Sequence, residues 1–201
     1  MRTLAIECAT EACSVALFDG ETVVDSAHKV LGRGHADQLV PMIAALPDRG
    51  HAQRILVSLG PGSFTGVRIG VATGKALGFA WGCEVLGYPT LSLVAAIAQA
   101  DCKWQAVTVC MTGGHGEWFV QDFAGDSLGP AVSLSRDAAI ARDRGLPLAG
   151  SQAAEFAALV GNRDAHFLLP DASRTNLLSR GILTTAVAPI YGRGPDARLP
   201  G

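Results

Sequence analysis

The sequence predicts an α/β protein of two lobes, each with a mixed sheet and helices. Short apolar segments of strand length alternate with segments of helical periodicity along the 201 residues. The order of strands first and helices second recurs after a break near residues 100–103, which indicates two related units. Apolar residues make up 49% of the chain and charged residues 17%, so both units can bury a core. We therefore expect a first lobe over residues 1–100 and a smaller, less regular lobe over residues 101–201.

Three strands are expected at the start of the first lobe. Residues 4–6 and 14–18 are apolar runs of strand length. Asp19-Gly20 is a hairpin turn signal, because glycine accepts positive φ, and residues 21–26 then return beside the second strand. At least two of these strands are therefore antiparallel.

The helices of the first lobe follow from periodicity. Leu39, Met42, Ile43 and Leu46 share one helical face, and Pro47 marks the end of that helix. The remaining elements are expected as a buried strand at 55–59, a glycine-rich loop at 60–66, a helix at 67–81, a short strand at 85–86 and a helix at 91–100.

The second lobe repeats this pattern less regularly. Strands are expected at 106–111 and 117–123, followed by a turn at Gly125-Asp126. Its helices are expected after a Ser135 cap, at 153–160, and from an Asp171 or Ser173 cap to Leu183. The last ten residues are rich in glycine, proline and arginine, and we expect a loosely held tail there.

A ridge of glycines runs along the helix expected at 67–81. Its members recur every four residues and are Gly66, Gly70, Gly74, Gly78 and Gly82; Ala72, Ala76 and Ala80 repeat the interval beside them. Each interior glycine costs about 1 kcal/mol relative to alanine, so a close packing contact must offset the loss. Residues four apart form the main packing ridge of a helix. The occupant of this groove is either an element of the same lobe, the default for a buried helix, or a helix of another chain.

Composition and charge exclude several classes of protein. The net charge is −2 without a basic run, so direct binding of nucleic acid is not expected. Glu7 interrupts the N-terminal apolar run too early for a signal peptide, and residues 91–100 are too short to span a membrane. The five cysteines form no Cys-x-x-Cys pair and are typical of small core residues in a reducing compartment. We expect a soluble, cytoplasmic protein without a membrane segment.

No catalytic or metal-binding constellation is recognised. The five histidines show no His-Glu-x-x-His spacing. Ile69 stands where a Walker motif ending at Gly74-Lys75 needs its first glycine, and Pro61 stands where Gly-x-Ser-x-Gly needs one before Ser63. The loop at 60–66 still precedes a helix N-terminus, where free N–H groups favour anions. Ser63 and Thr65 either contact such an anion or cap the helix.

Several segments resemble proteins of the TsaB (YeaZ) family. The longest is Leu59-Gly60-Pro61-Gly62-Ser63-Phe64-Thr65-Gly66-Val67-Arg68-Ile69-Gly70, which is close to the family's most characteristic motif. Residues 4–17, 35–43 and 89–92 also fit the family, and residues 189–193 resemble its C-terminal tail. The resemblance is strong over residues 1–100 and thinner afterwards. Glu7 stands where relatives usually have aspartate.

The resemblance implies the actin-like ATPase (ASKHA, ribonuclease H-like) fold and a non-catalytic subunit. That subunit serves the complex that makes N6-threonylcarbamoyladenosine at position 37 of tRNA (t6A37). Its implied partners are TsaD, which carries the metal and most of the nucleotide chemistry, and the ATPase TsaE. No cofactor or metal is therefore expected on this chain, tRNA is met only indirectly, and a homodimer is implied when TsaD is absent. The alternative is a stand-alone ASKHA-type ATPase or M22-type peptidase.

The resemblance also implies that N-terminal helices form a bundle with the partner. The residues expected at that interface are Leu39, Met42, Ile43, Val67, Gly70, Gly74, Ala76 and Gly78. Residual nucleotide contacts or helix-cap contacts are expected at Glu7, Thr10, Ser63 and Thr65. No residue is assigned a catalytic role.

Overall fold

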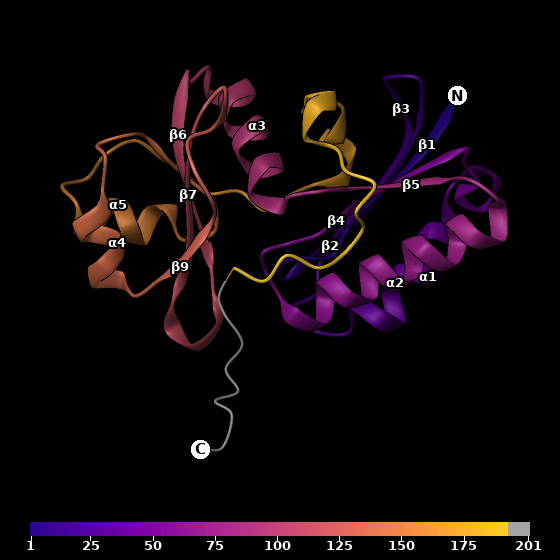
Figure 1. Cartoon of the computed structure of the whole chain (residues 1–201), viewed down its shortest axis with the longest axis horizontal. Helices are drawn as coiled ribbons and strands as arrows, with labels where there is room; N and C mark the ends of the chain where they lie inside the picture. The colour runs from indigo at the N-terminus through magenta and orange to yellow at the C-terminus, as the bar shows by residue number, and fades with distance from the viewer. Residues whose placement is uncertain (193–201) are drawn as a thin grey trace.

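A computed structural model of the chain describes residues 1–192 and has two lobes, each built around one sheet (Figure 1). The first sheet has the strand order β3-β2-β1-β4-β5 and the second has the order β11-β10-β6-β7-β8, with β9 also paired to β7. The predicted α/β architecture with two mixed sheets is therefore confirmed. Of the tail expected over the last ten residues, only Gly192 lies within the described part of the chain.

The first sheet combines an antiparallel meander with two parallel strands. Its strands are β1 (Arg2–Glu7), β2 (Ala12–Asp19), β3 (Thr22–Val30), β4 (Arg54–Ser58) and β5 (Glu84–Tyr88). The predicted hairpin joins β2 and β3, and Gly20 takes a φ of 61° at its turn. β4 and β5 are parallel to β1 because helices connect them.

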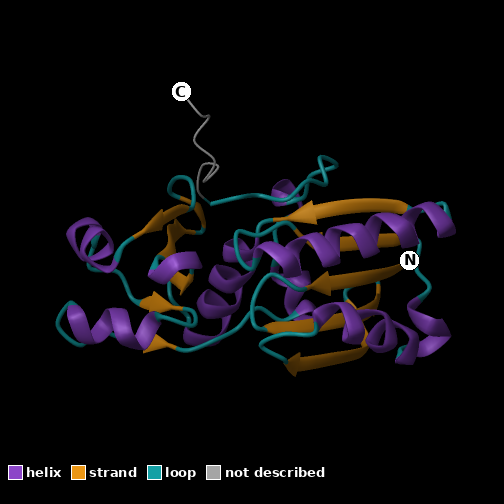
Figure 2. Cartoon of the chain, turned by 90° about the horizontal axis from the view of Figure 1, so that it is seen from below, coloured by secondary structure: helices purple, strands orange, loops and turns teal. Residues whose placement is uncertain are grey.

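Helices cover both faces of this sheet. Helices α1 (His35–Ala45) and α2 (Phe64–Trp81) lie next to each other on one face, which Figure 2 views from the outside. Their inward apolar residues pack with those of β1, β2 and β4 into one core. Helix α3 (Thr90–Cys102) lies on the other face, between the two sheets, and its core extends into both lobes. The two lobes are therefore joined through a common apolar layer.

The second lobe carries its remaining helices on the outer face of its sheet. Its strands are β6 (Ala106–Thr112), β7 (Trp118–Ala124), β8 (Asp126–Ser127), β9 (Val132–Leu134), β10 (Leu148–Ala149) and β11 (Ala165–His166). Helices α4 (Arg136–Arg142) and α5 (Ala153–Leu159) pack there around Trp118 and Phe156. Ser135 caps α4 as predicted, since its hydroxyl accepts a hydrogen bond from the Ala138 N–H.

Two local predictions are wrong. The helix expected from about residue 67 begins three residues earlier, at Phe64; the cap predicted for Ser63 is confirmed, since its hydroxyl accepts a hydrogen bond from the Gly66 N–H. The helix expected from Asp171 to Leu183 is instead two short 3₁₀ turns, η3 (Ala172–Leu177) and η4 (Arg180–Ile182), although Asp171 does cap the first. The other two 3₁₀ turns of residues 1–192 are η1 (Pro47–Gly50) and η2 (Gly114–Gly116).

The end of the described chain returns to the first lobe. η3 packs against β2 and α3, and the Ala172 N–H donates to the Ser14 hydroxyl at 2.9 Å. Thr184 then bridges Gly87 on β5, and the Ile190 N–H donates to the Leu59 carbonyl at 2.7 Å. The two sheets lie on either side of the boundary predicted near residue 100, but residues 172–190 cross it again. Within residues 1–192, no helix is both long enough and apolar enough to cross a membrane.

Candidate functional site

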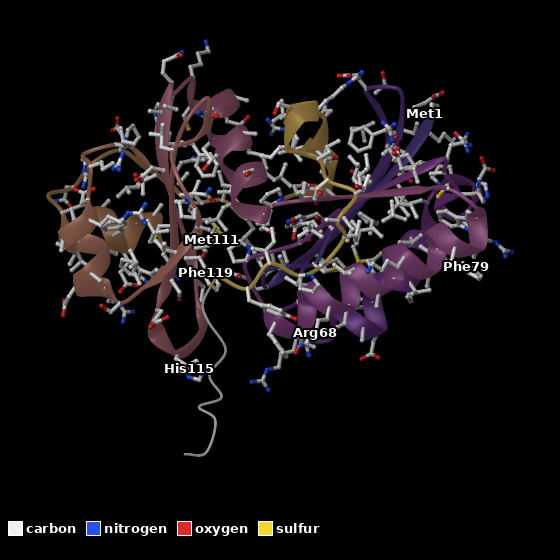
Figure 3. All side chains as sticks on the ribbon, viewed as in Figure 1. Met1, Arg68, Phe79, Met111, His115 and Phe119 are labelled. Carbon is white, nitrogen blue, oxygen red and sulfur yellow. The ribbon has the colours of Figure 1, made fainter. Side chains whose placement is uncertain are left out.

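A cavity of about 500 Å³ opens between the two lobes. It is lined from the first lobe by residues 9–11, 62–64 and Val67, from the second by residues 111–115 and Phe119, and from the C-terminal segment by residues 190–192. In Figure 3, Met111 and Phe119 lie between the lobes and His115 lies at the turn between β6 and β7. The cavity thus has two strand-to-strand connections facing each other, with the start of α2 beside them.

Glycines bring the start of α2 against the end of β1. The Ser63 N–H donates to the Ala9 carbonyl at 2.6 Å. A Cβ at Gly62 would lie 1.9 Å from that carbonyl oxygen, and a Cβ at Gly66 would lie 2.1 Å from the Cys8 carbonyl oxygen. Both positions therefore require glycine, since backbone atoms cannot move away as a side chain can. This contact explains the glycine-rich motif without a bound phosphate.

Glu7 lies at the end of β1 beneath the cavity and is 0% exposed. Its Oε1 accepts a hydrogen bond from the Ala9 N–H at 2.7 Å, and the Tyr88 hydroxyl lies 3.3 Å from its Oε2. Burial raises the pKa of Glu7 from 4.5 to about 7, although the hydrogen bonds act in the opposite direction. Glu7 is absent from the cavity wall, and its carboxyl is a buried group of the core.

The C-terminal segment closes one side of the cavity with an aromatic cluster. The rings of Tyr191 and Phe64 lie 5.6 Å apart, and the Arg68 guanidinium lies 3.6 Å from the centre of the Phe64 ring. Arg68 Nε also donates to the Tyr191 hydroxyl at 3.2 Å. These contacts join the start of α2 to a segment far along the chain, and Figure 3 shows Arg68 at that end of α2.

The glycine ridge is filled from within its own lobe. A Cβ at Gly74 would lie 3.5 Å from Val57 Cβ on β4, and a Cβ at Gly78 would lie 2.2 Å from a side-chain carbon of β5. Gly66 meets the end of β1 in the same way. The ridge lets α2 lie close to the sheet, so the expectation that a foreign helix fills this groove is wrong.

The predicted interface residues follow the same correction. All but one are buried in the core or against the sheet, namely Leu39, Met42, Ile43, Val67, Gly70, Gly74 and Gly78. Only Ala76 is exposed. Helical periodicity identified the apolar side of each helix correctly, but that side packs on the lobe's own strands.

The opposite side of the two helices carries an uncovered apolar surface. We call it the outer helical face and define it by Val40 on α1 and Ala72, Ala76, Phe79 and Ala80 on α2, all of which are exposed. The Phe79 side chain is 92% exposed and that of Val40 is 57% exposed. Figure 3 shows Phe79 on the side of α2 away from the sheet. The alanines of this face have no side-chain atoms beyond Cβ and add little bulk to it.

The residues predicted for nucleotide or cap contacts separate into three groups. Thr10 and Ser63 line the cavity, and Ser63 also caps α2. Thr65 is exposed and does not line the cavity, while Glu7 is sealed beneath it. Among residues 1–192, no three histidine, cysteine, aspartate or glutamate side chains converge as metal ligands.

Sequence reasoning missed two contributions to the site. His115 was assigned to no site, but it lines the cavity at the β6–β7 turn. His35 was also unassigned, although it is buried and its Nε2 lies 2.8 Å from the Thr10 carbonyl oxygen. It ties α1 to the loop beside the cavity. A histidine at the start of an amphipathic helix was the available signal, but its partner is 25 residues away in the chain.

The fold and its interlobe cavity define a two-lobed α/β protein of the actin-like ATPase (ASKHA) class. YeaZ from Pseudomonas aeruginosa superposes with a TM-score of 0.78 at 25% identity, covering 94% of this chain and 99% of that one. A second Pseudomonas aeruginosa structure, an uncharacterized protein with similarity to peptidase YEAZ, gives a TM-score of 0.79 at 26% identity and covers 96% of this chain and 99% of that one.

Sequence comparisons give the family. The model of TsaD, tRNA N6-adenosine threonylcarbamoyltransferase, matches residues 27–190. The tRNA threonylcarbamoyladenosine biosynthesis protein TsaB of Escherichia coli is 38% identical over 137 residues, which is 64% of this chain and 58% of that protein. An uncharacterized protein of Mycobacterium tuberculosis is 29% identical in an alignment that covers 97% of this chain and 93% of that protein. The chain therefore belongs to the TsaD family and, within it, to the TsaB (YeaZ) group.

Proposed function

We propose that this chain is an accessory subunit of tRNA threonylcarbamoyladenosine biosynthesis that binds a TsaD-type catalytic subunit through its outer helical face. The names of its TsaB relatives and of the matching TsaD model support the pathway and the partner. The observation that carries the proposal is an almost fully exposed phenylalanine, Phe79, on the same helix as the exposed alanines 72, 76 and 80.

The outer helical face has the features of a helix-docking surface. Ala72, Ala76 and Ala80 have no side-chain atoms beyond Cβ, so a partner helix can approach the backbone of α2 closely. Phe79 offers a large apolar side chain that gains free energy when a partner covers it. Two adjacent helices with exposed apolar sides complete a four-helix bundle when a second pair docks. The partner therefore packs on the side of α1 and α2 opposite the glycine ridge.

The burial of Glu7 supports the division of labour between subunits. The carboxyl at the end of β1 is fully enclosed and does not line the cavity. A carboxylate that is to hold a metal or activate water must reach the substrate. The proposal therefore assigns ATP, the metal and the transfer step to the partner subunits, with TsaE as the further ATPase.

A charge placed on the outer helical face tests the proposal. Phe79→Asp should reduce capture of a co-expressed TsaD-type partner by at least about tenfold, because interface hot spots are worth about 2 kcal/mol or more. Formation of the modified adenosine by the reconstituted subunits should fall in parallel. The matched control is Phe167→Asp in the second lobe, where the phenylalanine is also exposed, at 63%. The control should retain both partner capture and activity.

Three outcomes separate the alternatives. Equal capture of the two variants by the partner would reject the outer helical face. The chain alone could form a homodimer that dissociates when TsaD is added. If Phe79→Asp also disrupted that homodimer, the homodimer and the complex with TsaD would both use the outer helical face. Turnover of ATP or peptide by the lone chain, lost in Glu7→Ala, would favour the stand-alone enzyme and contradict the accessory role.

A further inference from the structure

Two thiols face each other at the point where the β1–β2 ladder ends. The last pair of the antiparallel register joins Glu7 to Ser14. Extending this register by one residue places Cys8, which lies just beyond β1, opposite Cys13, and their sulfur atoms lie 3.4 Å apart. Both thiols are free in the structure. Within residues 1–192, the other three cysteines have no thiol neighbour of this kind; they are Cys83, Cys102 and Cys110.

This placement meets the geometric requirement for a cross-link. A disulfide holds its sulfurs about 2 Å apart and joins Cα atoms about 4.4–6.8 Å apart. Directly opposed residues of an antiparallel pair have Cα atoms about 4.5–5.5 Å apart. We propose that Cys8 and Cys13 form a reversible redox site, in which a peroxide of the hydrogen peroxide class oxidises the two thiols to an intramolecular disulfide.

The surroundings favour Cys13 as the thiol that reacts first. Lys29 is the cross-strand partner of Cys13 in the β2–β3 register, and its positive charge favours the Cys13 thiolate. The pKa of the Cys13 thiol is lowered, chiefly by the hydrogen bond with Cys8, although burial and the charge of Glu7 act in the opposite direction. The same contact with Cys13 raises the pKa of Cys8. The thiolate is the nucleophile towards peroxide, so attack begins at Cys13 and Cys8 serves as the resolving thiol.

Peroxide can reach the buried pair only when the chain around it opens, and we expect that opening at the loop between the two cysteines. Both cysteines are 0% exposed, but residues 9–11 between them line the open interlobe cavity. Local opening of a short connection of this kind requires far less free energy than global unfolding. Hydrogen peroxide is close to water in size, so the opening that admits it is small.

The reaction balances without a further reagent. The Cys13 thiolate attacks one peroxide oxygen, the O–O bond breaks, and hydroxide leaves and takes a proton to become water. Cys13 then carries a sulfenic acid. The Cys8 sulfur attacks the Cys13 sulfur, the S–O bond breaks, and the second oxygen leaves as water with the Cys8 proton. Two thiols are oxidised by two electrons in total, and one peroxide is reduced to two waters.

The cross-link would act on the wall of the cavity. Drawing the sulfurs together closes a covalent loop around residues 9–12, three of which line the cavity. The Nε2 atom of His35 lies 2.8 Å from the Thr10 carbonyl oxygen and 3.3 Å from the Ala12 carbonyl oxygen. A change in this loop would therefore alter the contact that joins it to α1. We expect slower amide exchange over residues 9–12 in the oxidised protein, because a short cross-link restricts local opening.

Peptide mapping of the whole chain tests the site directly. Cleavage after Arg2 and Lys29 releases residues 3–29, a peptide that contains Cys8 and Cys13 and no other cysteine. The reduced protein is treated with hydrogen peroxide, unfolded and alkylated. With longer peroxide treatment, this peptide should increasingly appear without alkyl groups on either cysteine and two hydrogens lighter than the reduced, unalkylated peptide. This form should accumulate at least about tenfold faster than the form of the Cys110 peptide that escapes alkylation. Dithiothreitol should restore both groups.

Cys110 is the matched control because it is also 0% exposed, and burial raises the pKa of its thiol. In Cys8→Ala, peroxide should leave a sulfenic acid on Cys13 that dimedone labels. In Cys13→Ala, Cys8 should react no faster than Cys110. The proposal would be overturned if the two thiols of the wild-type peptide stayed reduced for as long as Cys110 does. A disulfide that joins two chains would also overturn it.

Discussion

The two long sides of α2 carry the same spacing of small residues and meet different surroundings. Gly66, Gly70, Gly74 and Gly78 are buried against the sheet, whereas Ala72, Ala76 and Ala80 are exposed. A four-residue repeat of small residues therefore does not say by itself which side receives a partner. Glycine marks the covered side at Gly66 and Gly78, because a Cβ there would lie 2.1 Å from a backbone oxygen and 2.2 Å from a side-chain carbon, respectively.

The requirement for glycine also varies along the inner side. A Cβ at Gly66 would meet a backbone carbonyl oxygen at 2.1 Å, while a Cβ at Gly74 would lie 3.5 Å from its nearest neighbour, an ordinary contact distance. The helix approaches its neighbours most closely near its two ends, at Gly66 beside the end of β1 and at Gly78 beside β5. Substitutions along α2 can therefore separate positions that demand glycine from positions that tolerate a methyl group.

The largest effect is expected for Gly66→Ala. The added methyl group would collide with the Cys8 carbonyl oxygen, and neither β1 nor the start of α2 can move without breaking the contact between Ser63 and Ala9. Overpacking of this kind costs about 3 kcal/mol. Urea unfolding followed by circular dichroism should show this loss of free energy of unfolding. A loss below about 1 kcal/mol would show that the start of α2 is looser than these contacts imply.

Local patterns predicted most elements, whereas the site depends on contacts between distant residues. The periodicity at Leu39 and Met42 identified α1, and the apolar run at 106–111 identified β6, because each signal lies within one element. Which side of α2 is covered depends on strands β1, β4 and β5, which lie outside this helix in the sequence. Arg68 and Tyr191 meet across 123 positions of the chain, and no periodicity reports such a pair. The cavity wall could not be predicted for the same reason.

The next effect concerns Glu7, whose buried carboxyl lies at the end of β1 beside Tyr88. Because burial raises the pKa of Glu7 from 4.5 to about 7, the folded protein keeps a proton that the unfolded chain releases. The contribution of the protonated Glu7 to the free energy of unfolding is complete below about pH 4.5, and it is lost as the pH rises to about 7. The full loss is about 3 kcal/mol, since one pKa unit corresponds to about 1.4 kcal/mol.

Glu7→Gln should remove this pH dependence because the amide does not titrate. As the pH rises from about 4.5 to about 7, the free energy of unfolding of the variant should increase relative to that of the wild type. Urea unfolding at a series of pH values measures the difference. Parallel pH profiles for the two proteins would show that Glu7 titrates in the folded state much as it does in the unfolded chain.

The smallest effect compares the two sides of α2 by opposite substitutions. Gly74→Ala should stabilise the protein by up to about 1 kcal/mol, because alanine has the higher helix propensity and its methyl group would lie 3.5 Å from Val57 Cβ. Ala76→Gly should destabilise it by about the same amount, since Ala76 is exposed and propensity alone decides there. Thermal unfolding measures both variants. Partner capture should be retained by Gly74→Ala, which changes only the covered side. If Gly74→Ala lost the partner while keeping its stability, the inner side of α2 would be part of the docking surface after all, and the distinction between glycine and alanine sides would fail.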